Sequence, residues 1–239
     1  TVADGVTEWL KTSEQRRLRP LMVDWFHIGA DIENSVPTQG LPDDSSLVLK
    51  LLSARPSFLM VGTIEPRKGY LQTIAAFEQL WDSGVDANLV IVGKEGWKDF
   101  PEELRRTIPE MVSRLRPHPE LGRRLFWLEG ISDEYLELIY TASTCLIAAS
   151  EGEGFGLPLI EAAQHKLPII ARDIPVFREV AGNHAFYFSG KEPTDLAGAV
   201  VRWLELHESG KNPDSDGMPW LSWRQSTERL LSIILDNRL

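Results

Sequence analysis

Short apolar runs alternate with amphipathic stretches of helical length along most of the chain, from about residue 57 onward. This alternation is typical of β/α units, in which strands form a mostly parallel sheet and helices cover both of its faces. The runs that we predict to be strands are 57–62, 88–93, 124–128, 144–149 and 168–171. The stretches predicted to be helices are 70–82, 101–115, 133–142, 157–166 and 194–208. The pattern therefore predicts an α/β fold with a Rossmann-like sheet.

The two ends of the chain depart from this repeat. The start holds an amphipathic stretch at about 2–18, the apolar run Met22–His27, and a stretch rich in Pro, Gly, Ser and Asp over 34–46. Near the other end, a polar break precedes a last predicted helix at 220–235. We therefore divide the chain into a connecting segment, a Rossmann-like domain and a C-terminal helix, over residues 1–45, 46–219 and 220–239.

Composition narrows the classes of partner. Twenty-five basic and thirty-five acidic residues leave a formal charge of −10, which argues against a broad nucleic-acid or anionic-lipid surface. The lone Cys145 excludes an intrachain disulfide, and the five histidines show no metal-ligand spacing, so we expect no metal. Because no run reaches the roughly 18 apolar residues that span a bilayer, and no signal peptide is visible, we expect a cytoplasmic protein.

The first chemical motif is Ser150–Glu161, which joins a predicted buried strand to a helix that starts near Gly156 or Leu157. Its glycines at 152, 154 and 156 let backbone amides approach a ligand closely. A helix N-terminus adds unpaired N–H groups and a partial positive charge, so this segment is suited to an anion. Its spacing and position differ from those of the dinucleotide-binding fingerprint.

The same motif carries two carboxylates, Glu153 in the loop and Glu161 one turn inside the helix. Helical side chains tilt toward the N-terminus, so both acids are expected to face one crevice, where they could hold two pairs of hydroxyls. A nucleotide sugar has two such pairs. The alternative is that both acids only favour the helix dipole. His165, four residues after Glu161, is expected to pair with it.

The second motif is Gly62–Gly69, between the first predicted strand and its helix. Arg67 and Lys68 could neutralise a diphosphate there, although a charged turn standing alone is more often merely solvated. Gly62 and Gly93 close the first two strands. Because parallel strands end at the same edge of a sheet, both motifs are expected at one crevice.

With Ile131–Asp133 and Ile174–Gly182, these motifs resemble the C-terminal domain of the group 1 glycosyltransferases, carbohydrate-active family four. The resemblance covers about residues 45–235, and Glu153 and Glu161 meet the family's Glu-x7-Glu pattern. It implies the C-terminal half of a two-domain GT-B fold and transfer with retention at the anomeric carbon. It also implies that residues 1–45 include the end of an N-terminal domain that is otherwise missing.

The resemblance implies that Arg67 and Lys68 bind the donor diphosphate, that Glu153 faces the transferred sugar, and that Glu161 binds the ribose. Of these residues, we expect Arg67, Lys68 and Glu153 to be catalytic. The other donor-binding positions that it implies are Gly62, Thr63, Lys94, Ile131, Ser132, Gly154, Phe155, Gly156 and Leu157. Cations and helix-terminal amides then stabilise the leaving group in place of a metal, and no cofactor is expected beyond the donor substrate. Lys166 stands where the family usually has a glycine.

Gly62–Gly69 and Trp25–Asp31 are also similar to bacterial mannosyltransferases of surface-polysaccharide assembly. We therefore expect GDP-mannose as donor, with UDP-sugars as the main rival, and a saccharide or a lipid-linked saccharide as acceptor. The missing half would supply the acceptor site and any peripheral attachment to the inner face of the membrane. Two alternatives remain open at this point: a stand-alone nucleotide-sugar-binding module, and a GT-B nucleotide-sugar epimerase.

Overall fold

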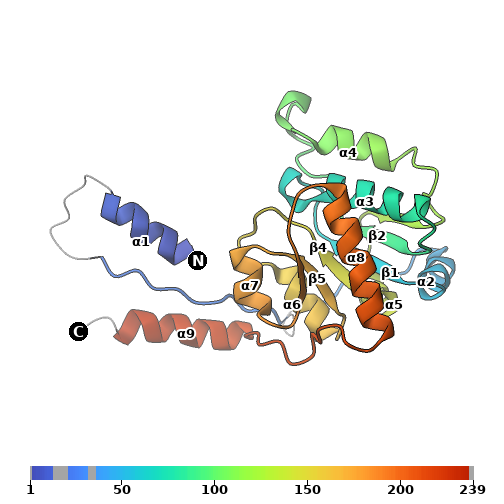
Figure 1. The fold of residues 1–239 in the computed structure, drawn as a ribbon. Helices are drawn as coiled ribbons and strands as arrows, with labels where there is room; N and C mark the ends of the chain where they lie inside the picture. Colours follow the sequence, from blue (N-terminus) through green and yellow to red (C-terminus); the bar gives the residue numbers. More distant parts are fainter. Residues whose placement is uncertain (1, 13–20, 32–35, 237–239) are drawn as a thin grey trace. The chain divides into compact units, whose positions relative to one another are not determined.

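The computed structural model describes residues 2–12, 21–31 and 36–236. The chain divides into two compact units, one formed by residues 1–34 with 219–239 and one by residues 35–218. The larger unit contains the sheet and both chemical motifs (Figure 1).

The larger unit is built on one six-stranded parallel sheet with the strand order β3-β2-β1-β4-β5-β6. Its strands are β1 (Ser57–Val61), β2 (Asn88–Val92), β3 (Leu125–Leu128), β4 (Cys145–Ala148), β5 (Ile169–Arg172) and β6 (Phe186–Phe188). Its α-helices are α2 (Ser45–Ser53), α3 (Tyr70–Asp82), α4 (Ile108–Leu115), α5 (Asp133–Ala142), α6 (Leu157–Gln164), α7 (Pro175–Ala181) and α8 (Pro193–Glu208). The predicted α/β fold with a Rossmann-like parallel sheet is confirmed.

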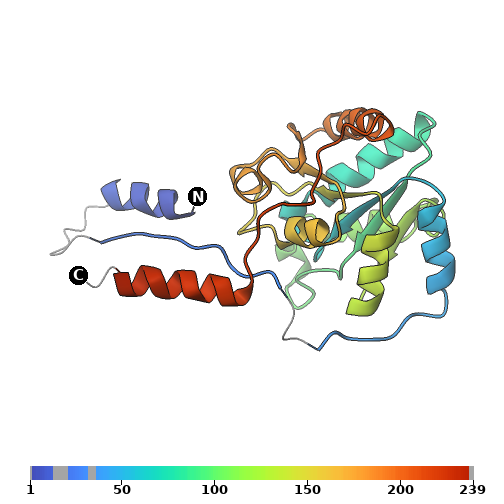
Figure 2. The same cartoon turned by 90° about the horizontal axis from the view of Figure 1, so that it is seen from below.

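Helices cover both faces of the sheet. Figure 2 shows α3 and α8 together on one face and α2 and α5 on the other. On the first face, the ring of Phe58 on β1 lies 5.6 Å from both Phe77 on α3 and Trp203 on α8, in edge-to-face contacts. Strands β2, β4 and β5 are buried at every position, because a parallel sheet with helices on both sides leaves no strand face to solvent.

The structure corrects several predicted elements. The helix predicted at 101–115 is interrupted: a short 3-10 turn covers Glu102–Leu104, and α4 begins only at Ile108. Arg106 between them has φ +53°, a left-handed conformation that an α-helix cannot contain. The elements α2, α7 and β6 were not predicted, because they are too short for helical or alternating periodicity to stand out.

The smaller unit contains α1 (Val2–Thr12), an extended segment over residues 21–31, and α9 (Trp223–Asp236). Of the helix predicted at 2–18, residues 13–18 lie outside the described part. Residues 21–31 contact both α9 and the segment before it. The Ala30 N–H donates to the Leu221 carbonyl at 2.9 Å, and the Ser226 hydroxyl of α9 donates to the His27 carbonyl at 2.7 Å. Among the described residues, no helix has both the length and the apolar character needed to cross a membrane.

The backbone of Lys166, at the end of α6, is strained. Lys166, just after the helix, has φ +55°, where glycine is favoured and a side chain is strained. We therefore expect Lys166→Gly to raise the midpoint of thermal unfolding by about 2–4 °C. Lys166→Ala is the control, because it also removes the exposed ion pair with Asp216 but keeps the strain. A glycine variant no more stable than the alanine variant would contradict this explanation.

Candidate functional site

The site lies where the strand order of the sheet reverses. Reading outward, β1, β2 and β3 follow in one direction and β4, β5 and β6 in the other, so β1 and β4 are neighbours at the switch point. In open α/β sheets, ligands bind in the crevice that forms there, beyond the carboxyl ends of the strands. The loops after β1 and β4 carry the two motifs identified in the sequence, which the fold therefore brings together.

The loop after β1 is shaped by close backbone contacts. The 3-10 turn Pro66–Lys68 places Arg67 and Lys68 at the carboxyl end of β1, and Gly69 then starts α3 with φ +75°. A Cβ atom on Gly69 would lie 2.3 Å from the carbonyl oxygen of Ala149, so only glycine fits. The two loops are joined directly, because the backbone N–H of Glu151 donates to the carbonyl of Arg67 at 2.7 Å.

The loop after β4 ends at the N-terminus of α6. Gly156, with φ +97°, precedes the first helical residue, Leu157, so the glycine is required by the backbone turn. Added Cβ atoms on Gly152 and Gly154 would meet nothing within 4 Å. The protein itself therefore gives no steric reason for these two glycines, and a ligand that approaches the backbone closely would give one.

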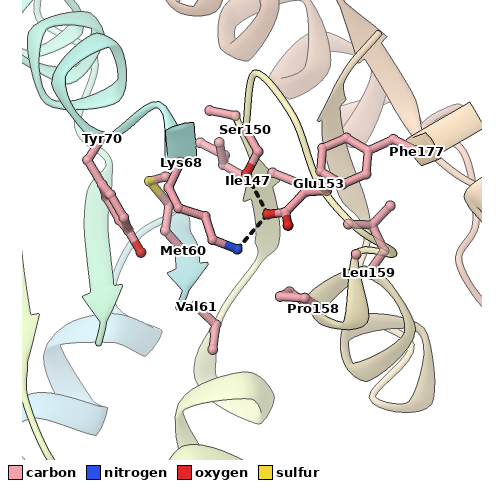
Figure 3. A pocket seen from close by; sticks show the side chains of 13 residues that line it. Met60, Val61, Lys68, Tyr70, Ile147, Ser150, Glu153, Pro158, Leu159 and Phe177 are labelled. Carbon is pink, nitrogen blue, oxygen red and sulfur yellow. Dashed lines mark hydrogen bonds and ion pairs between the residues drawn. The ribbon is translucent and has the colours of Figure 1, made fainter. Parts of the chain in front are cut away.

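Three charged side chains meet between the loops. The Glu153 carboxylate lies 2.5 Å from Arg67 Nη1 through one oxygen and 2.5 Å from Lys68 Nζ through the other. The Ser150 hydroxyl donates to Glu153 Oε1 at 2.9 Å, and Figure 3 shows Lys68 and Ser150 converging on this carboxylate. Arg67 also contacts Glu65 at 3.1 Å. Sequence reasoning placed Arg67, Lys68 and Glu153 in one crevice, but it did not predict that they pair with one another.

The electrostatics of this cluster follow from its partial burial. The side chain of Glu153 is only 9 % exposed, against 14 % for Lys68 and 46 % for Arg67. Burial opposes ionisation of Glu153, but the hydrogen bonds from Lys68 and Arg67 outweigh it and hold the pKa of the carboxyl below its usual value. The site thus holds two cations and one fixed anion at neutral pH.

A pocket opens beside the cluster. Lys68, Ser150, Glu153 and Gly156 line it together with apolar residues, namely Met60, Val61, Ile147, Ala148, Ala149, Pro158, Leu159 and Phe177. Tyr70 also lines it, and its hydroxyl donates to the Gly62 carbonyl at 2.5 Å, while burial raises the pKa of the phenol. Tyr70 was missed because a tyrosine at the start of a predicted helix resembles an ordinary core position.

Glu161, on α6, contacts a side chain of the neighbouring helix α5. Its carboxylate accepts a hydrogen bond from the Tyr140 hydroxyl of α5 at 2.7 Å, and it is not among the residues that line the pocket. The expected pairing of His165 with Glu161 is wrong: His165 Nε2 lies 3.3 Å from Glu137, and its ring stacks on Tyr140 at 4.6 Å. The parallel ring contact favours this rotamer over one that reaches along α6.

Of the remaining predicted positions, Thr63 follows β1, Lys94 follows β2 and Ser132 follows β3. Lys94 is exposed and passes over Gly130, whose added Cβ would lie 3.1 Å from Lys94 Cε. Ser132 caps α5 by accepting from the Tyr135 N–H at 3.1 Å, and its hydroxyl donates to the Gly40 carbonyl at 2.6 Å. These residues therefore lie along the same edge of the sheet as the cluster of Arg67, Lys68 and Glu153.

Sequence reasoning missed one segment of this edge. Thr38 donates to the Asp133 carboxylate through both its N–H and its hydroxyl at 2.8 Å, and the Gly40 N–H donates to Glu134 at 2.8 Å. Residues 38–40 are thus fixed against the start of α5, beside Ser132. The sequence does contain a signal for this contact, namely the two acidic residues Asp133 and Glu134 at the start of α5. Acidic side chains at such positions often accept hydrogen bonds from backbone N–H groups.

Comparison with known proteins gives a consistent result. A family model described as "Glycosyl transferases group 1" matches residues 48–217. The serotype-specific mannosyltransferase WbdA of Escherichia coli is 52 % identical over 233 residues, which are 97 % of this chain and 28 % of that protein. The O-antigen chain mannosyltransferase RfbU of Salmonella typhimurium is 30 % identical over 152 residues, 64 % of this chain and 39 % of RfbU. The chain thus spans well under half the length of these relatives.

Solved structures share the fold. The crystal structure of Anabaena Alr3699/HepE in complex with UDP and glucose superimposes with a TM-score of 0.61 at 17 % identity, over 84 % of this chain and 53 % of that one. The match covers about half of the length of the solved protein. The predicted fold class, the C-terminal half of a GT-B glycosyltransferase, is confirmed.

Proposed function

The chain belongs to the group 1 glycosyltransferases, and we propose that its larger unit binds the nucleotide-sugar donor of a retaining mannosyltransferase. The observation that carries this proposal is the pair of cations, Arg67 and Lys68, beside the pocket at the switch point between β1 and β4. A planar guanidinium and a compact ammonium suit a diphosphate, and the N-terminus of α6 faces anions favourably.

The proposed chemistry transfers the sugar from the diphosphate to an acceptor hydroxyl. The bond between the anomeric carbon and the diphosphate oxygen breaks, and its electron pair stays on the diphosphate. A bond to the acceptor oxygen forms on the same face of the sugar, and the proton of the acceptor hydroxyl passes to the departing diphosphate. Arg67, Lys68 and the backbone amides of residues 154–157 would stabilise the charge that develops on the leaving group. Glu153 would face the sugar and Glu161 the ribose.

We propose GDP-mannose as the donor. WbdA and RfbU are both named as mannosyltransferases, which supports mannose as the transferred sugar. The base would lie against the edge formed by Ile131, Ser132 and the segment 38–40, next to Lys94. A UDP-sugar is the rival donor, because HepE, which shares the fold, was solved with UDP and glucose.

The acceptor is proposed to be a saccharide, free or lipid-linked, in the assembly of a bacterial surface polysaccharide. The name of RfbU as an O-antigen chain mannosyltransferase supports this context. In the GT-B arrangement that we infer for the whole enzyme, the second half supplies the acceptor site. A lipid-linked acceptor would place the reaction at the cytoplasmic face of a membrane.

The donor assignment is tested by calorimetric titration of the full-length protein with GDP, UDP and ADP, followed by their sugars. We expect GDP and GDP-mannose to bind most tightly. Tighter binding of UDP than of GDP would indicate that the donor is a UDP-sugar. A folded protein that binds none of these nucleotides would refute the proposed function, and conversion of a donor without any acceptor would instead indicate an epimerase.

The contacts of Glu153 lead to a second prediction. In the free site its carboxylate occupies both cations that a donor diphosphate would need. We expect the affinity of the Glu153→Gln variant for GDP to be at least about tenfold higher than that of the unchanged protein. A neutral amide competes with the diphosphate more weakly than a carboxylate does for Arg67 and Lys68. Titration with GDP is the cleanest measurement, since GDP carries no sugar for Glu153 to contact.

The matched control for this prediction is Glu151→Gln. Glu151 lies two residues earlier in the same loop, and its partner Lys191, at 2.5 Å, is exposed. This variant removes one negative charge from the loop without releasing Arg67 or Lys68, so its GDP affinity should stay unchanged. Equal or weaker GDP binding by Glu153→Gln would show that the carboxylate does not compete with the diphosphate.

A further inference from the structure

A buried cation stands at the end of β5, one strand away from the switch point. The exposed fraction of Arg172 is 5 %, and its guanidinium contacts three neutral oxygens. Nε donates to the Ala149 carbonyl at 3.0 Å, Nη1 donates to the Gly190 carbonyl, and Nη2 donates to the Gln72 side-chain oxygen. These partners come from the residue that follows β4, from the loop before α8 and from α3.

Burying this charge is costly for the fold. Among the described residues no salt bridge joins Arg172 to a carboxylate, and burial lowers the pKa of its guanidinium although the charges of Glu151 and Asp195 act in the opposite direction. The ring of Phe188 lies 4.9 Å away, and a cation–π contact of this kind offsets only part of the desolvation. Apolar residues of similar volume often replace buried charges without loss of stability, so stability alone gives little reason for an arginine here.

The hydrogen bond to Ala149 shows what the arginine achieves. The same carbonyl oxygen is the atom against which Gly69 packs, since a Cβ on Gly69 would lie 2.3 Å from it. Ala149 also immediately precedes Ser150, which binds Glu153. One backbone carbonyl therefore sets the spacing between the loop that carries Arg67 and Lys68 and the loop that carries Glu153.

We propose that Arg172 is a positioning residue for glycosyl transfer. It fixes the Ala149 carbonyl, and through it holds the two donor-binding loops at the separation that leaving-group stabilisation requires. The inference rests on the proposed function. Lysine cannot replace the arginine, because an ammonium on a flexible stem cannot reach three acceptors that a planar fork contacts together.

The test compares Arg172→Met and Arg172→Lys with the unchanged full-length enzyme, by donor kinetics and thermal unfolding. We expect both variants to lose about 10²-fold in kcat, because shifts of about 1 Å in catalytic groups have effects of this size. The KM for the donor should change by less than about threefold, since Arg67 and Lys68 still bind the diphosphate. Arg172→Met should remain folded at the assay temperature.

Two further variants sharpen the result. Gln72→Met removes one acceptor of the guanidinium while Arg172 stays, and it should give an intermediate loss of kcat. Arg178→Met removes an exposed arginine that pairs with Asp173 at 2.8 Å, and it should leave kcat unchanged. If Arg172→Met does not fold, Arg172→Lys and Gln72→Met still test the kinetic prediction.

The outcomes separate the inference from the proposed function. Folded Arg172 variants with an unchanged kcat would overturn the positioning role while leaving the function intact. A higher KM with an unchanged kcat would show that Arg172 serves donor binding. A loss of kcat only in proportion to the unfolded fraction would show that it serves the fold. Either result would also overturn the positioning role. If the unchanged enzyme transfers no sugar from any nucleotide donor, the proposed function fails, and the inference fails with it.

Discussion

Replacing Arg67 and Lys68 together with alanine is expected to abolish sugar transfer by the full-length enzyme. Both cations lie beside the pocket at the switch point, where they would bind the departing diphosphate. Hydrogen bonds to charged groups contribute about 1.5–3 kcal/mol each, so losing two should lower kcat/KM by about 10²- to 10⁴-fold. The measurement is steady-state transfer from GDP-mannose, with folding followed by thermal unfolding.

This double variant needs a control for its side effect on Glu153. Without the two cations, a carboxylate that is 9 % exposed keeps only the hydrogen bond from Ser150 and loses both cationic partners, which destabilises the loop. The triple variant that adds Glu153→Gln removes this unpaired charge and should restore the stability but not the transfer. Lys191→Ala, which removes an exposed cation near the same loop, should keep full activity. Undiminished turnover in the double variant would refute the assignment of the diphosphate site.

The second large effect is expected at Gly93, which follows β2. A Cβ there would lie 1.9 Å from the carbonyl oxygen of Gly62 and 2.7 Å from its carbonyl carbon. Because both obstructing atoms belong to the backbone, no side-chain rotation can relieve the contact. We expect Gly93→Ala to lower the free energy of unfolding by about 3 kcal/mol or more, at the upper end of single substitutions. Denaturant unfolding measures this change.

The same substitution should also weaken donor binding in the molecules that stay folded. Moving Gly62 away from Gly93 displaces the loop that carries Arg67 and Lys68, since that loop starts at Gly62. Gly152→Ala is the matched control, because its added Cβ meets nothing within 4 Å and should leave the unfolding free energy unchanged. If Gly93→Ala proves as stable as Gly152→Ala, the close approach of the β1 and β2 loops is not a constraint on the fold.

The sequence predicted the sheet because burial on both faces makes its strands continuous apolar runs, which stand out against the amphipathic helices. Five of the six strands were located in this way. The helix predicted at 101–115 is too long. The helical periodicity of apolar residues continues across Arg106, but the backbone of Arg106 is left-handed and interrupts the helix. The short β6 was missed, since three residues carry too little pattern to be recognised.

For the candidate site as well, the sequence predicts local features, and the tertiary structure decides which side chains meet. Glycine spacing, the two acids and the neighbouring cations are local features, so the sequence alone determined that Arg67, Lys68 and Glu153 belong to strand-end loops. Only the tertiary structure decided that Glu153 pairs with both cations, that Tyr140 binds Glu161, and that Arg172 fixes the Ala149 carbonyl. Each of these contacts joins residues on different elements, and their distances depend on how strands and helices pack. Sequence periodicity specifies the elements, whereas packing specifies which of their side chains meet.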